Sequence, residues 1–114
     1  MKSLITPHFF NQAKRLKKRF PNLGDDLEKS LESFKPQNET HIGKSIYKVR
    51  INPTSTNKGK SGGLRMYVYL YQIKRLLVPV CIYSKSDRDS ISLNELNYHS
   101  QITLKQIAES LHLR

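Results

Sequence analysis

The spacing of apolar residues changes along this chain, and the change separates helices from strands. In the first third of the chain, apolar side chains recur every three to four residues, which predicts two amphipathic helices. Thr6 can cap the first helix, and Pro7 fits its first position because a proline there loses no hydrogen bond. Pro21 separates the two helices and Pro36 ends the second. We expect a helical hairpin that covers one face of a sheet.

From Ile46 onward the apolar period becomes two, which predicts strands. The expected strands are a short one at residues 3–6 and longer ones at 46–51, 64–71 and 75–84. The last of these is apolar throughout, as in a strand buried on both faces. Pro79 cannot donate to a strand ladder, so we expect a bulge or a missing bond there. The polar segment 37–43 is expected to be a loop.

This order of elements predicts an α+β fold in a single domain spanning residues 1–114. Two N-terminal helices would pack on a small, mainly antiparallel four-stranded sheet, with a short C-terminal helix or helices after residue 92. One face of the sheet would be covered and the other open. No apolar run approaches the roughly 20 residues that span a bilayer, and the N-terminal apolar stretch is short for a signal peptide, so we expect a cytoplasmic protein. The lone Cys81 excludes an internal disulfide and is expected to be a small buried hydrophobe.

The charge of the chain is strongly positive and unevenly distributed. Its 20 Lys and Arg residues face 9 Asp and Glu residues, a net charge of +11, and no acid lies between Glu39 and Asp87. That interval contains nine cations: Lys44, Lys48, Arg50, Lys58, Lys60, Arg65, Lys74, Arg75 and Lys85. A positive field of this kind indicates an anionic partner, either nucleic acid or a membrane surface. The tyrosines among the cations favour nucleic acid.

Three of these cations fall on neighbouring predicted strands. Residues two apart on a strand share a face and lie roughly 6 to 7 Å apart, so Lys48 and Arg50, with Arg65 from the paired strand, could surround one phosphate. A solvated sheet face is the alternative. Like charges side by side on a sheet repel, however, so we favour a binding site.

Other chemical motifs are weak. The sequence KGKSGG at residues 58–63 lacks the upstream glycine of a Walker motif and leads into a strand, which excludes a nucleoside triphosphate site of that kind. Its glycines would let backbone amides approach a phosphodiester. The four histidines show no ligand spacing, and we expect no metal and no cofactor.

These features resemble the RelE/ParE superfamily of bacterial type II toxin–antitoxin toxins, and within it the RelE/HigB-like branch. The resemblance rests on KGKSGGLRMY at residues 58–67, IYSK at 82–85 and YKVR at 47–50. It implies a microbial-ribonuclease-like fold, an adjacently encoded antitoxin as partner, and a ribosome-dependent endoribonuclease (an mRNA interferase) that inhibits translation. In that reaction a 2′-hydroxyl attacks the adjacent phosphodiester without metal. It needs a base, cations for the phosphorane, and an acid for the leaving oxygen.

The resemblance also implies roles for individual residues. The catalytic residues would be Lys48, Arg50, Arg65 and Lys85. The RNA-binding residues would be Lys58, Lys60, Tyr67, Tyr69 and Arg88. Lys48 as the base is a hypothesis, because a lysine is ordinarily protonated at neutral pH. The two tyrosines could stack an extruded base or pack as ordinary strand residues.

The chain departs from the family pattern at two positions. Ser86 stands where some members have an arginine, and Ser92 or a neighbour stands where they have a tyrosine. Arg88 or a sheet tyrosine is a candidate substitute, and the identity of the acid stays open.

Two other functions remain open. A ParE-like inhibitor of DNA gyrase is one, although such members generally lack the basic sheet cluster. A non-catalytic RNA-binding module is the other, in which the same cations only neutralise phosphates.

Overall fold

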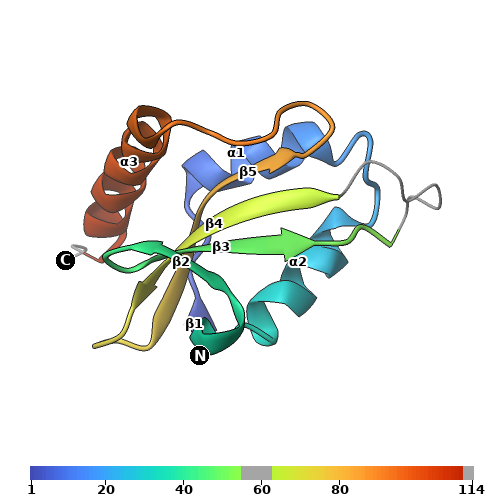
Figure 1. Cartoon of the computed structure of the whole chain (residues 1–114). Helices are drawn as coiled ribbons and strands as arrows, with labels where there is room; N and C mark the ends of the chain where they lie inside the picture. The colour runs from blue at the N-terminus through green and yellow to red at the C-terminus, as the bar shows by residue number, and fades with distance from the viewer. Residues whose placement is uncertain (55–62, 112–114) are drawn as a thin grey trace.

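The computed structural model describes residues 1–54 and 63–111 (Figure 1). The elements in chain order are β1 (Lys2–Ser3), α1 (Pro7–Leu16), α2 (Leu23–Glu32), a 3-10 turn (Pro36–Asn38), β2 (Thr40–Gly43), β3 (Ile46–Ile51), β4 (Leu64–Tyr71), β5 (Leu76–Ser84) and α3 (Leu93–Leu111). The expected α+β class and the N-terminal helical hairpin are confirmed. Thr6 caps α1 by accepting a hydrogen bond from the backbone of Phe9 at 3.2 Å, and Pro7 is the first helical residue.

The sheet has five strands in the order β1-β5-β4-β3-β2, one more than we expected. β1 pairs with β5 in parallel, and every other pair is antiparallel. The additional strand is β2, in the segment that we expected to be a loop. β2 is an exposed edge strand without an apolar period, and it forms by pairing with β3, where the ring of His41 stacks on Tyr47 at 4.8 Å. A strand that forms by pairing at the sheet edge cannot be predicted from the local pattern of apolar residues.

A register shift on β5 confirms the irregularity expected near Pro79. Tyr67 pairs with Cys81, whereas Val68 pairs with Pro79, so Val80 is an additional residue on β5. Strand side chains alternate between faces, and one additional residue reverses that alternation. This bulge therefore lets residues at both ends of β5 point toward the same helices.

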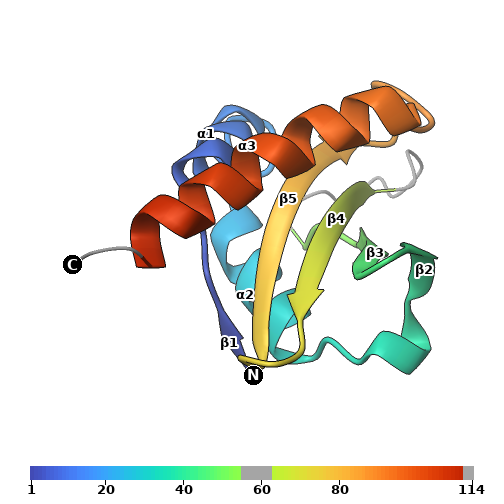
Figure 2. The ribbon, with the colours of Figure 1, turned by 90° about the vertical axis from the view of Figure 1, so that its left-hand side faces the viewer.

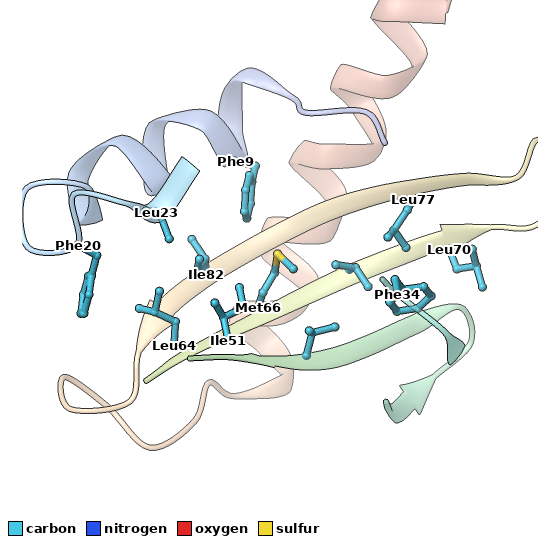
Figure 3. Packing of buried hydrophobic residues seen from close by; sticks show 12 residues of the cluster. Phe9, Phe20, Leu23, Phe34, Ile51, Leu64, Met66, Leu70, Leu77 and Ile82 are labelled. Carbon is cyan, nitrogen blue, oxygen red and sulfur yellow. The ribbon is translucent and has the colours of Figure 1, made fainter. Parts of the chain in front are cut away.

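The main core lies between the sheet and the hairpin of α1 and α2. Figure 3 shows Phe9, Phe20 and Leu23 from the helical side packed toward Leu64 and Met66 on β4. All five side chains are buried. Apolar faces of helices and strands are thus removed from water together, which is the main driving force for this fold.

The other face of the sheet is partly covered, contrary to our expectation of an open face. α3 is one helix of 19 residues, not one or two short helices, and Figure 2 shows it lying across the end of β5. Its residue Leu96 packs into a second buried cluster with Tyr67, Val80 and Tyr83. The capping pattern at Thr103 does not start a new helix, because the Thr103 hydroxyl donates to the backbone oxygen of His99 at 2.7 Å inside α3.

The side chain of Gln12 continues the sheet beyond the short strand β1. Its Nε2 donates to the backbone oxygen of Val80 at 3.2 Å, and its Oε1 accepts from the backbone nitrogen of Ile82 at 3.1 Å. One amide side chain on α1 thereby satisfies two backbone groups on the edge of β5. The contact fixes α1 against the strand that leads into the candidate site.

Candidate nucleic-acid interface

Two arginines face each other across the paired strands β3 and β4. Arg50 is the direct partner of Arg65, and Arg65 is the direct partner of Tyr83 on β5. Directly opposed residues in antiparallel strands have Cβ atoms about 4.5 to 5.5 Å apart, and like charges at that distance destabilise the pair. Arg50 is exposed, whereas Arg65 is only 6% exposed. The sheet therefore holds two positive charges side by side.

A second row of residues lies one step along the same face. Lys48 pairs with Tyr67, and Tyr67 pairs with Cys81. The ammonium of Lys48 lies 5.8 Å from the centroid of the Tyr67 ring, within the range of a cation–π contact. Lys48 and Arg50 are two residues apart on β3 and therefore share this face. The structure thus brings together the three cations that the sequence singled out.

The burial of the tyrosines changes one expectation. Tyr67 is only 5% exposed and belongs to the cluster under α3, so its ring contacts protein rather than a free surface. The structure therefore favours the second of the two expectations for Tyr67, packing as an ordinary strand residue, because α3 and the neighbouring strands cover most of its ring. Tyr69 is half-buried and packs at the margin of the same cluster, which leaves part of its ring accessible.

Arg65 is positioned by backbone contacts from its own strand. Its Nη1 donates to the backbone oxygen of Leu64 at 3.2 Å. Arginines are rarely buried without specific interactions, because removing a guanidinium from water is costly. A buried guanidinium with its position fixed costs little further reorganisation when an anion binds.

Three of the acidic residues that follow position 86, Asp87, Asp89 and Glu95, each pair with a cation. Lys85 lies 3.8 Å from Asp89, Arg19 bonds Asp87 at 2.6 Å, and Arg88 bonds Glu95 at 2.6 and 2.8 Å. The Arg19 guanidinium lowers the pKa of Asp87, and the Arg88 guanidinium lowers the pKa of Glu95. Each of the three ion pairs has at least one partner in the segment that joins β5 to α3, and Arg19 ties that segment to the turn after α1.

Lys85 is the first residue beyond β5. Its backbone nitrogen donates to the oxygen of Gly63 at 2.9 Å, which places it across from the start of β4. Strand alternation puts Lys85 on the same face as Tyr83 and Arg65. The expected fourth catalytic cation therefore lies one step beyond the row formed by Arg50, Arg65 and Tyr83.

Arg88 is held in place over an aromatic ring. Its guanidinium lies 5.7 Å from the centroid of the Tyr83 ring, while Glu95 binds it in a bidentate pair. Planar guanidinium groups suit both contacts at once. Glu95 in turn belongs to the first turn of α3, where Ser92 accepts a hydrogen bond from its backbone nitrogen at 3.0 Å.

Both departures from the family pattern have local structural roles. Ser86 shares a 2.9 Å hydrogen bond between its hydroxyl and that of Ser84. Ser92 caps α3. Neither serine therefore supplies the missing arginine or tyrosine.

The segment between β3 and β4 is fixed at its described ends. Thr54 donates through its backbone nitrogen and its hydroxyl to the buried Asp26 on α2, at 3.1 and 3.0 Å. Gly63 closes the other end with φ = +74°, and a Cβ there would lie 2.5 Å from the Ile51 oxygen. Lys58 and Lys60, two of the expected RNA-binding residues, lie outside the described residues.

A pair of histidines joins α1 to α3, an interaction that sequence reasoning missed. His8 Nε2 and His99 Nδ1 are 2.7 Å apart, and the ring of His99 lies 3.8 Å from Glu95. Burial lowers the pKa of both histidines, and positive charge on His99 and Arg15 lowers the pKa of His8 further. No spacing signal could reveal the pair, because 91 residues separate its members.

Cys81 is a buried thiol, as expected. Burial raises its pKa to about 12, so it stays protonated at neutral pH. Within residues 1–54 and 63–111, no group of three or more His, Cys, Asp or Glu side chains is arranged to hold a metal ion. Over the same residues, no helix is both long and apolar enough to cross a membrane.

Comparison with known proteins agrees with this architecture. The family described as the RelE toxin of the RelE/RelB toxin–antitoxin system matches residues 10–112. A solved structure of the E. coli toxin RelE in the free state, with two arginines replaced by alanine, superposes with a TM-score of 0.54. The two chains are 15% identical over 93% of this chain and 96% of that one, a likeness that shows the fold. No curated protein sequence matches this chain.

The fold and the basic sheet face define a small toxin-like α+β domain. Because the family match covers nearly the whole chain, the chain belongs to the RelE toxin family of toxin–antitoxin systems. Membership in this family implies a cognate antitoxin as its protein partner.

Proposed function

We propose that this toxin is a ribosome-dependent endoribonuclease that cuts mRNA and thereby inhibits translation in the cytoplasm. The observation that carries the proposal is the direct opposition of Arg50 and Arg65, with Lys48 beside them on the same face. A sheet gains nothing from opposed like charges unless an anion lies between or above them. A scissile phosphate provides that anion.

The same residues suit the chemistry of 2′-hydroxyl attack. The phosphorane that forms carries additional negative charge, which Arg50 and Arg65 would stabilise. Lys48, on the same face, is the candidate base for the 2′-hydroxyl, acting in its amine form. Lys85, one step beyond this row, would add positive charge on the leaving side. Arg88 and the exposed part of Tyr69, with Lys58 and Lys60, would contact the neighbouring nucleotides.

The proposal is tested with purified toxin, ribosomes programmed with a defined mRNA, and mapping of fragment ends. We expect fragments with 5′-hydroxyl ends and 2′,3′-cyclic phosphates, and strongly reduced cleavage by the Arg50→Gln variant. Lys74→Gln is the matched control, since Lys74 is an exposed cation in the turn after β4, outside the site. Intact mRNA in the presence of active ribosomes would overturn the proposal.

Assays on the same purified toxin distinguish the proposed nuclease from the two other candidate functions, a gyrase inhibitor and an RNA-binding module. A gyrase inhibitor would block DNA supercoiling and leave mRNA whole. An RNA-binding module would retain RNA with a steep salt dependence but produce no new ends. The cluster of Arg50, Arg65 and Lys48 on one sheet face favours the nuclease over both.

A further inference from the structure

The proposed reaction lacks an assigned acid for its leaving group. When the P–O5′ bond breaks, the departing oxygen carries a full negative charge unless a proton reaches it. Ser92 is committed to the cap of α3, as described above. A donor for the leaving oxygen must therefore come from another element near Arg65.

Tyr83 occupies the position that such a donor needs. It is the direct partner of Arg65 on the neighbouring strand, so the row across the sheet runs Arg50, Arg65, Tyr83. Its ring centroid lies 6.4 Å from that of Tyr67, which pairs with Lys48. The candidate base Lys48 on β3 and Tyr83 on β5 thus lie on opposite sides of β4, the strand that carries Arg65. In-line attack places the nucleophile and the leaving oxygen on opposite sides of phosphorus.

Tyr83 is largely buried and borders a cavity between α1 and α3. It is 8% exposed, and the cavity of about 280 Å³ is also lined by Gln12, Arg15, Arg88, Glu95 and His99 but not by Lys48, Arg50 or Arg65. The Tyr83 hydroxyl makes a long 3.5 Å hydrogen bond to the backbone oxygen of Asp89. A bond of that length is weak and can be exchanged for a substrate oxygen.

We propose that Tyr83 is the general acid of this toxin, a role that rests on the proposed nuclease function. As the 2′-oxygen bonds to phosphorus, its proton passes to the Lys48 amine. The P–O5′ bond then breaks with its electron pair on O5′, which takes the proton from the Tyr83 hydroxyl. The resulting phenolate regains a proton from water, and Lys48 returns its proton to solvent.

The charges around Tyr83 support this role. Burial raises the pKa of Tyr83 well above its ordinary value and the adjacent Tyr67 raises it further, which keeps the hydroxyl protonated at neutral pH, whereas the charge of Arg65 lowers the pKa and favours release of the proton. The Arg88 guanidinium over the ring stabilises the transient phenolate. Glu95 holds that guanidinium in place and acts as a positioning residue.

The decisive experiment compares two substrates. A synthetic mRNA with sulfur in place of the bridging 5′-oxygen has a leaving group that needs no proton. We expect Tyr83→Phe to cut the ordinary mRNA about 10²- to 10³-fold more slowly than wild type, and to cut the sulfur-containing mRNA at nearly the wild-type rate. Tyr71→Phe, at a half-buried tyrosine at the far end of β4, is the matched control and should cut both at wild-type rates. Thermal unfolding checks that Tyr83→Phe is folded.

Each other outcome overturns the assignment. Equal losses on the two substrates would mean that Tyr83 only supports the structure. If Tyr67→Phe, and not Tyr83→Phe, cut the ordinary mRNA slowly and the sulfur-containing mRNA at the wild-type rate, Tyr67 would be the acid. A Tyr83→Phe variant within threefold of wild type would remove the role altogether, while the nuclease proposal would stand. A wild-type toxin that cuts neither mRNA would overturn both proposals.

Discussion

Arg50 and Arg65 are direct cross-strand partners on β3 and β4, so two positive charges meet on one face of the sheet. Opposed like charges cost free energy in the unbound fold, and an anionic ligand offsets that cost. We therefore predict that Arg50→Gln stabilises the free protein slightly, by up to about 1 kcal/mol. The same change should lower mRNA cleavage by at least about tenfold.

The measurement is urea unfolding alongside the ribosome cleavage assay. Lys74→Gln removes one positive charge outside the row and should leave both quantities close to wild type. If Arg50→Gln lowered both the free energy of unfolding and the cleavage rate, the claim that this arginine pair costs stability in the unbound protein would be wrong.

The histidine pair between α1 and α3 predicts a pH-dependent stability. Because burial lowers the pKa of His8 and His99 in the folded state, the unfolded chain binds protons more readily, and the free energy of unfolding falls as the pH drops below about 6.5. Arg15 and Arg88 oppose protonation of the pair, whereas Glu95 favours it for His99, without reversing the net direction.

Thermal unfolding at pH 7 and pH 5 tests this prediction. We expect wild type to lose stability over that range and His8→Gln to lose less, because one of the two titrating groups is gone. His41→Gln, on the distant edge strand β2, is the control and should follow wild type. An identical pH response in all three proteins would show that the pair does not couple to folding.

The two hydrogen bonds from the Gln12 side chain to β5 are expected to stabilise the fold. Replacement by leucine leaves the Val80 carbonyl and the Ile82 amide of β5 without their side-chain partner. Unsatisfied buried backbone groups cost about 1–3 kcal/mol, so Gln12→Leu should lower the free energy of unfolding by at least that amount. Asn11→Leu, an exposed neighbour on α1, should change it little. Equal urea midpoints for the two variants would contradict the role assigned to the amide.

Two glycines are expected to respond to alanine in opposite directions. Gly63 has φ = +74°, and a Cβ would meet the Ile51 oxygen at 2.5 Å, so Gly63→Ala should destabilise by about 1–3 kcal/mol. A Cβ on Gly24 in α2 meets nothing within 4 Å, so Gly24→Ala should stabilise by about 0.5–1 kcal/mol. Denaturant titration of both variants measures the difference. Stabilisation by Gly63→Ala would show that the turn can relax without its positive φ.

The sequence by itself determined much of this protein. Apolar periods placed both N-terminal helices and the strands β3, β4 and β5, because each element must bury one face against the others. The run without acids identified Lys48, Arg50 and Arg65 as one cluster, since local spacing fixes which residues of a strand share a face. The irregularity near Pro79 followed from the missing amide of proline.

The tertiary structure alone decided the rest. β2 exists because β3 is available to pair with it, and α3 continues through Thr103 because its hydroxyl bonds within the helix. The covering of Tyr67, the His8–His99 contact and the place of Tyr83 beside Arg65 all join residues far apart in the chain. Contacts of this kind depend on how the elements pack, which no local period encodes.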